Sequence, residues 1–261
     1  MKQTMRLVCI VVLFGLVLPV FGMTVQEFEF EVFRLTNIER ENHSLSPLQY
    51  EYGLADIARM HSNNMLRFDY FSHKDHLGDE VFDRQKRYYP ELVVASIGEN
   101  IIKFNSHTGT FNPQELVDGW MNSEHHRKNI LNPDYTHMGV GIGLSANTLY
   151  ATQNFAKPLV KLRSILPDTL DRLRIYRISF EYMGTDPIKD LTCTLIYPDS
   201  EQTYQISDEQ EMVGAQPIKI DWQDKQMFSV LVPFLAGRGD YQLCFGYKGN
   251  YFPEGILLRA R

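Results

Sequence analysis

Apolar residues repeat every three or four positions in two stretches of the first half of the chain, 28–35 and 54–65, and this spacing predicts two amphipathic helices. A third helix is expected after Asn112, a capping residue, with Pro113 in its first turn. Residues 138–156, MGVGIGLSANTLYATQNFA, predict two strands that turn at Asn147. The first half therefore combines helices with strands.

From about residue 170 the pattern changes to strict alternation of apolar and polar residues. Residues 178–182, 218–222 and 228–234 alternate in this way, and turn signals such as GTDP, YPDS and GRGD separate such segments. Short alternating strands with regular turns are typical of a small all-β sandwich.

Two domains are expected, and all eight histidines fall in the first. Residues 158–169 contain Pro158 and Pro167 and are interpreted as the connection. The first domain then covers 23–157, and the β-sandwich-like domain covers 170–261. The predicted fold class is α/β for the first domain, followed by all-β.

The first 22 residues have the features of a secretory signal peptide. Lys2 and Arg6 precede an apolar run, 7–20, that ends near the small residue Gly22. An uncleaved anchor is the alternative, but a spanning helix needs ~20 apolar residues. The chain is therefore expected to be secreted, periplasmic or associated with the cell envelope, with no integral membrane span after cleavage of 1–22.

The negative net charge of the chain limits which kinds of molecule it is expected to bind. The formal charge is −6, and it becomes −8 when Lys2 and Arg6 leave with the signal peptide. An acidic chain without a basic block is not expected to bind nucleic acid.

Two cysteines remain after signal cleavage, and their pairing is open at this point. Cys193 falls on the same side of its strand as the apolar residues Leu191 and Leu195. Cys244 falls on the opposite side of its strand from Leu243 and Phe245. An exported protein could oxidise them to one disulfide.

Several catalytic motifs are absent from the sequence. GVGIG, 139–143, lacks the third glycine of a dinucleotide-binding loop and is not followed by a helical pattern. Small residues in a strand more often indicate close packing against a helix. The chain also has no HExxH and no GxSxG motif.

Six short motifs occur in an order that resembles a known family. They are LTNIERENHSLSPLQY, ADIARMHSNNM, YFSH, IGENI, WMNSEHHRKNILNPDYTHMGVGIG and YATQNFA. Over about 28–156 the chain resembles the CAP superfamily (also called SCP/TAPS), which comprises the cysteine-rich secretory, antigen 5 and pathogenesis-related proteins, and within it the bacterial secreted branch. The resemblance implies an α-β-α sandwich with a central cleft lined by two histidines and two acids. It does not extend to the second domain.

The resemblance assigns cleft residues by position. His73 corresponds to the first histidine, Glu99 of GEN to the first acid and His126 to the second histidine. Many animal and plant members have a glutamate where this chain has Ser123. The resemblance implies that the protein recognises lipids, peptides or other proteins through its cleft or surface. It also makes His73, His126 and Glu99 candidate metal ligands.

The residues around His126 are expected to be structural. On a helix that begins at Ser123, positions 123 and 126 share a face, whereas Glu124 points elsewhere. Glu124 is expected to pair with Lys128, and Ser123 to cap the helix. Arg127 is expected to donate hydrogen bonds to carbonyls or to Asp134.

Other polar residues of the first domain are interpreted as support for the cleft. His61 lies on the apolar face of its helix and is expected to be a hydrogen-bonded core histidine. Asn100 and Trp120 are assigned to cleft lining or support, and Glu99 could serve only to accept backbone hydrogen bonds. The remaining histidines considered are expected at the surface: His76, His107, His125 and His137.

Three functional hypotheses follow. The first is a binding protein for a lipid, peptide or protein ligand. The second is a metal-assisted hydrolase or protease, with Glu99 as base and His73 and His126 holding a divalent metal such as zinc. The third gives the cleft no role and makes the sandwich an adhesive or docking module.

Overall fold

The computed structural model describes residues 23–199, 201, 203–207, 210–252 and 254–261. The predicted signal peptide, 1–22, lies outside the described residues. Within the described part of the chain, no helix is both long and apolar enough to cross a membrane.

The helices of the first domain follow the predicted periodicity. They are α1 (Val25–Asn42), α2 (Tyr52–Phe68), α3 (Val81–Tyr88), α4 (Pro113–Asn122) and α5 (Glu124–Ile130). Helix α4 begins as expected, because Pro113 occupies its first turn and the Asn112 side chain accepts a hydrogen bond from the amide of Gln114 at 3.0 Å.

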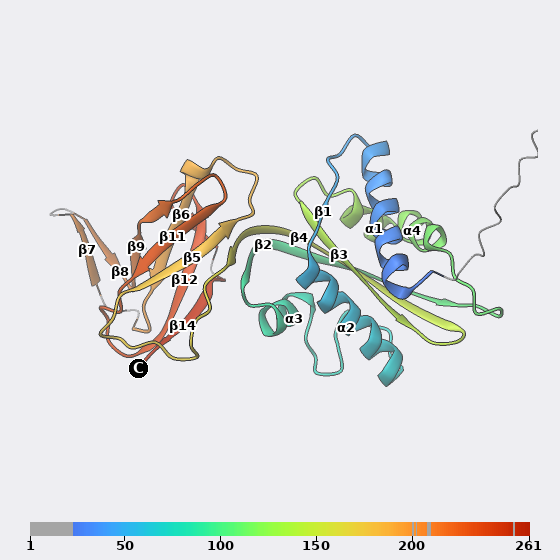
Figure 1. Ribbon diagram of the computed structural model, residues 1–261, viewed down its shortest axis with the longest axis horizontal. Helices are drawn as coiled ribbons and strands as arrows, with labels where there is room; N and C mark the ends of the chain where they lie inside the picture. Colours follow the sequence, from blue (N-terminus) through green and yellow to red (C-terminus); the bar gives the residue numbers. More distant parts are fainter. Residues whose placement is uncertain (1–22, 200, 202, 208–209, 253) are drawn as a thin grey trace, which may run out of the picture.

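The strands of this domain form the middle layer: β1 (Gln49–Tyr50), β2 (Leu92–Asn105), β3 (His137–Leu144) and β4 (Thr148–Leu162). Strands β3 and β4 form the predicted hairpin, β2 pairs with the other edge of β4, and β1 joins β3 in parallel. Helices α1 and α4 lie on one face of the sheet, and α2 and α3 lie on the other (Figure 1). The expected α-β-α sandwich is confirmed.

Glycines allow α2 to pack directly on β3. A Cβ atom at Gly141 would lie 1.9 Å from the backbone nitrogen of Arg59, and one at Gly139 would lie 2.1 Å from that of Ala55. The alternate residues of β3, such as Val140, face the opposite core, which contains Trp120. The glycines of GVGIG thus serve helix packing, as the sequence indicated.

The second domain contains two packed sheets. Its elements are β5 (Tyr176–Tyr182), a short 3-10 turn (Ile188–Asp190), β6 (Leu191–Ile196), β7 (Thr203–Ser207), β8 (Gln210–Val213), β9 (Ala215–Ile218), β10 (Ile220–Trp222), β11 (Met227–Val232), β12 (Gly239–Tyr247), β13 (Asn250–Tyr251) and β14 (Ile256–Ala260). One sheet has the order β5-β11-β10, and the other has the order β13-β12-β6-β9 with β14 beside β12. Phe180 and Phe228 from the first sheet contact Phe245 from the second, which closes the sandwich core.

Strand β4 connects the two domains into one sheet. Its last residues pair with β5, with Val160 opposite Tyr182 and Leu162 opposite Phe180 (Figure 1). Val160 also packs in the core of the second domain. Residues 158–162, which the sequence places in a connection, are therefore strand. Pro158 is accommodated because the register of β2 and β4 shifts beside it, where fewer amide donors are needed.

The strand register determines whether Cys193 and Cys244 can form a disulfide. Cys193 lies opposite Phe245 and Cys244 lies opposite Thr194, so the two thiols point to opposite faces of the sheet. No disulfide joins these two described residues. Burial raises the pKa of Cys244 to about 12 and that of Cys193 in the same direction, so both remain thiols at neutral pH.

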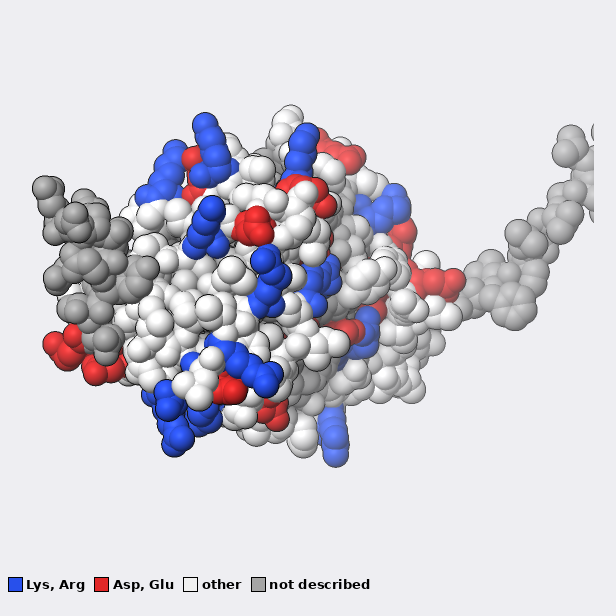
Figure 2. Space-filling model, turned by 60° about the vertical axis from the view of Figure 1, so that its left-hand side comes forward, with Lys and Arg blue, Asp and Glu red and all other residues white. Residues whose placement is uncertain are grey.

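The described surface carries charges of both signs. On the face drawn in Figure 2, basic and acidic side chains are interspersed, and neither sign forms one continuous area there.

Candidate functional site

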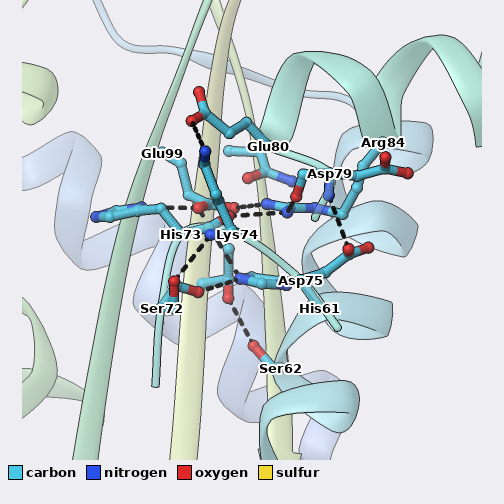
Figure 3. A network of polar contacts seen from close by, with 12 residues as sticks. His61, Ser62, Ser72, His73, Lys74, Asp75, Asp79, Glu80, Arg84 and Glu99 are labelled. Carbon is cyan, nitrogen blue, oxygen red and sulfur yellow. Dashed lines mark hydrogen bonds and ion pairs between the residues drawn. The ribbon is translucent and has the colours of Figure 1, made fainter. Parts of the chain in front are cut away.

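The structure brings His73 and Glu99 together, as the resemblance implies. His73 lies in the loop 69–80 after α2, and Glu99 lies in the middle of β2. The Nδ1 atom of His73 is 2.8 Å from Oε1 of Glu99 (Figure 3). The Glu99 side chain is 3% exposed and the His73 side chain 54% exposed. An outward-facing imidazole is thus anchored to a buried carboxylate.

Arg84 of α3 holds the other oxygen of Glu99. Its Nη2 atom donates to Oε2 of Glu99, and Nη1 donates to the carbonyls of His73 at 2.9 Å and Asp79 at 2.6 Å (Figure 3). One buried guanidinium therefore fixes both the carboxylate and the loop that carries His73. The expectation that Glu99 serves to accept backbone hydrogen bonds is wrong, because two side chains occupy its carboxylate. Its backbone carbonyl accepts from Asn129 instead, at 3.1 Å.

Sequence reasoning missed Arg84 as a member of the site. An arginine within a charged helix such as VFDRQKRY is expected at the surface, yet Arg84 and Gln85 are both buried. The sequence offered no clear signal for this burial, because Arg84 and Gln85 lie among charged residues of the same helix.

His61 lies beneath this pair. Its side chain is fully buried, and its Nε2 atom is 3.0 Å from the carbonyl of Ser72 and 4.0 Å from Oε1 of Glu99. Tyr70 approaches the other ring nitrogen at 3.5 Å. Burial lowers the pKa of His61 to about 4, so the ring is neutral at physiological pH and its Nε2 proton is directed at the Ser72 carbonyl. His61 therefore supports the loop and is not open to a ligand.

Acid should destabilise the fold through His61. Between its ordinary pKa of 6.5 and its folded pKa of about 4, only the unfolded chain binds a proton at this residue, so stability falls as the pH drops through this interval. We expect the free energy of unfolding of His61→Gln to depend less steeply on pH than that of the wild type, by about 3 kcal/mol between roughly pH 7 and pH 4. Urea unfolding at several pH values measures this. The exposed His107→Gln should leave the slope unchanged, and an equal slope for His61→Gln would contradict the prediction.

His126 is the second histidine of the site. It lies on α5 and is partly buried. Burial is the main cause that lowers the pKa of His126, and the positive charges of His73 and His125 lower it further. Glu99 instead raises the pKa of His73, chiefly through their hydrogen bond. The two candidate histidines thus differ, because the pKa of His73 is raised and that of His126 is lowered.

The residues on either side of His126 form α5, with one difference from expectation. Glu124 pairs with Lys128 at 2.7 Å, and Arg127 donates to the carbonyl of Met121 at 2.8 Å. Ser123 is at the N-cap position, but its side chain makes no capping hydrogen bond. Ser123 therefore occupies the cap position expected of it, between the end of α4 and the start of α5, without the side-chain hydrogen bond that usually accompanies a cap.

A buried amide network joins α5 to the sheet. Asn100 donates to the carbonyl of His126 and to Oε1 of Gln153, each at 3.1 Å. Asn129 donates to Oδ1 of Asn100 at 2.9 Å, and Gln153 donates to the hydroxyl of Thr36 at 2.8 Å. This network sets the position of His126 relative to Glu99. Asn129 and Gln153 were not identified from the sequence, since their partners are distant along the chain.

Two further residues have clear places. Trp120 is completely buried in the core beneath α4 and supports the site only through packing. The expectation of a surface position for His137 is wrong, because its side chain is 4% exposed at the start of β3. Its Nδ1 atom is 2.9 Å from the hydroxyl of Thr136, and burial lowers its pKa.

The donor set does not fit a three-ligand zinc site. Both oxygens of Glu99 are engaged, by His73 and Arg84, and Ser123 stands in the place of the second acid. Within the described part of the chain, no three His, Cys, Asp or Glu side chains are grouped to hold a metal ion. The expected role of Glu99 as a third ligand is therefore not supported.

The candidate site is also separate from three cavities of the structure. These have volumes of about 510, 390 and 370 Å3, and none of the three is lined by His73, Glu99 or His126.

Comparison with known proteins gives a family for the first domain. Residues 33–155 match the model of the cysteine-rich secretory protein (CAP) family. The uncharacterized protein YkwD of Bacillus subtilis is 42% identical over 118 residues, which are 45% of this chain and 43% of YkwD. The uncharacterized membrane protein YlbC of the same organism is 39% identical over 129 residues, 49% of this chain and 34% of YlbC. The chain thus spans less than half the length of these relatives.

Two solved structures are similar over about half of the chain. An extracellular SCP-domain protein of Bacillus anthracis is 35% identical, covers 50% of this chain and 40% of its own, and has a TM-score of 0.42. A cysteine-rich secretory protein of Staphylococcus aureus is 20% identical, covers 51% and 39%, and has a TM-score of 0.41. Residues 33–155 therefore form a CAP domain of the cysteine-rich secretory protein family, and over this part the chain is similar to the two Bacillus subtilis proteins.

Proposed function

We propose that this CAP domain acts outside the cytoplasm by binding, and that His73 recognises a carboxylate or phosphate group of its ligand. The observation that carries the proposal is the hydrogen bond from Nδ1 of His73 to buried Glu99, with half of the imidazole exposed. This bond orients the ring and directs Nε2 away from Glu99. Because Glu99 raises the pKa of His73, the ring protonates readily and Nε2 can then donate to an anion.

Apolar side chains near His73 suggest that the ligand is amphipathic. Phe71 is 50% exposed and Leu77 is 55% exposed on the same loop. Exposed apolar residues beside a fixed polar group are typical of binding sites. A lipid headgroup and the carboxyl end of a peptide share this chemistry, and experiment can distinguish them.

Hydrolysis is the alternative, and one observation favours it. A histidine that donates Nδ1–H to a carboxylate is the usual arrangement of a metal-binding histidine and its supporting acid. Against it, Glu99 has no oxygen free to act as a general base, and His73 and His126 provide only two ligands.

Binding assays with two pairs of probes test the proposal. The first pair is phosphatidylcholine vesicles with and without phosphatidylglycerol; the second is a peptide ending in a free phenylalanine carboxylate and its amidated form. We expect the acidic member of one pair to bind more tightly. His73→Gln should weaken that binding about tenfold, because a hydrogen bond to a charged group is lost. Affinity should fall as the pH rises through the raised pKa of His73, since the imidazolium is then lost.

The control is His125→Gln, which removes an exposed histidine of the same helix as His126 and should leave affinity unchanged. Equal binding of acidic and neutral probes, or equal affinity for His73→Gln, would contradict the proposal. Incubation with casein and a lipid ester, with and without zinc, tests the alternative. Zinc-dependent turnover that His126→Ala abolishes would establish hydrolysis instead.

A further inference from the structure

A cavity of about 510 Å3 lies between the two domains. Helix α3 and the start of β2 line it from the CAP domain, and residues 162–168 and 254–259 line it from the other side. Its volume is that of a small-molecule site, and such sites occur preferentially at domain interfaces. It shares no lining residue with the His73, Glu99 and His126 site.

The walls of this interdomain cavity are largely apolar. They include Phe82, Leu92, Val94, Leu162, Leu166 and Ile256. Leu92, Val94 and Ile256 are also buried core residues of the two domains. A hydrocarbon group placed there would remove apolar surface from water, which favours binding.

One buried polar group faces this apolar space. Gln85 is 2% exposed and lines the cavity. Its Nε2 atom donates to the carbonyls of Tyr89 and Leu92, each at 2.8 Å, and these two bonds fix the orientation of the amide. The remaining atom, Oε1, is an acceptor and receives no hydrogen bond from the described residues. This atom therefore favours a ligand that donates a hydrogen bond.

The charges around the cavity favour a cation. Lys86 is neutralised by an ion pair with Glu254, whereas Arg259, at 3.9 Å from Asp240, shares this carboxylate with Arg261, which lies at 2.8 Å. Glu91 and Asp168 also line the cavity. Neither of these two carboxylates has an ion-pair partner among the described residues.

We propose that the interdomain cavity binds a small amphipathic amine, with its hydrocarbon part against the apolar walls and its ammonium group toward the acidic rim. The carboxylates of Glu91 and Asp168 supply the complementary charge, and Oε1 of Gln85 supplies an acceptor for an N–H donor. A fatty acid of the same length is disfavoured, because the two cations (Lys86, Arg259) and three anions (Glu91, Asp168, Glu254) that line the cavity sum to a net charge of −1. This site is independent of the proposed function of His73.

Calorimetric titration of the whole chain with n-octylamine, 1-octanol and octanoate tests the proposal, because the three probes differ only in the head group. We expect saturable one-to-one binding of octylamine, and at least about tenfold weaker binding of octanoate. The double variant Glu91→Gln and Asp168→Asn should lose about fivefold in octylamine affinity and should bind octanol unchanged. Both substitutions preserve shape, and thermal melting verifies that the variant is folded.

Two further variants locate the binding. Leu166→Trp places an indole toward the cavity and should weaken binding of octylamine and octanol alike. Glu41→Gln removes one exposed carboxylate from α1, a helix that does not line the cavity, and should have no effect. The proposal is overturned if octylamine does not saturate, if octanoate binds as tightly as octylamine, or if Leu166→Trp binds as the wild type does.

Discussion

Replacing Arg84 with methionine is expected to lower the free energy of unfolding by about 3–5 kcal/mol, because removal of one partner leaves the other charge buried. Arg84 is completely buried and contacts Glu99, and it also donates to the carbonyls of His73 and Asp79. Methionine fills a similar volume without these donors. Urea unfolding of the variant and the wild type measures the difference.

A double-mutant cycle separates the ion pair from the loop contacts. In Arg84→Met combined with Glu99→Gln, the buried charge is absent, so part of the stability lost in Arg84→Met should return. The remaining loss reports the two carbonyl contacts. If the effects of the two substitutions simply add, Arg84 and Glu99 are not energetically coupled and the site is not anchored in this way.

Gly141→Ala is expected to destabilise the CAP domain by about 3 kcal/mol or more. The added Cβ would lie 1.9 Å from the backbone nitrogen of Arg59 and 2.3 Å from the carbonyl carbon of Ala58. Both are helix backbone atoms, so α2 as a whole would have to move away from β3. Because α2 also carries His61 at the base of the site, the same variant should bind the His73 ligand more weakly. Urea unfolding and the binding assay provide the two readouts.

Gly119→Ala is the matched control. Its Cβ would meet the terminal carbon of Ile102 at 2.8 Å, and a flexible side chain can rotate away. Alanine is also favoured over glycine inside a helix by about 1 kcal/mol. We therefore expect little net change. A loss for Gly119→Ala as large as that for Gly141→Ala would show that any added methyl group is costly, and would refute the close-approach argument.

Local pattern was sufficient for much of the fold. Helical periodicity over 28–35 and 54–65 identified α1 and α2, because one face of each must be buried. Alternation in the second domain predicted its strands for the corresponding reason in a sheet. For the site, the order of short motifs identified His73 and Glu99, which the structure places in hydrogen-bond contact.

Contacts between distant segments account for what the sequence did not predict. Arg84 is buried in the site because α3 packs beside β2, and His137 is buried at the start of β3, which lies between β1 and β4 in the sheet. These contacts leave no mark on the local pattern of apolar and polar residues, so that pattern could not predict the burial of Arg84 or His137.

The sequence by itself determined the helices and strands of the first half and the all-β character of the second, and its resemblance to the CAP superfamily supplied the α-β-α layers and the candidates His73, Glu99 and His126. Only the tertiary structure decided that Glu99 is occupied by Arg84, that Cys193 and Cys244 face apart, and that β4 continues into the second domain. The physical reason is that periodicity records which side of an element is buried, whereas strand register and helix docking decide which partner it meets.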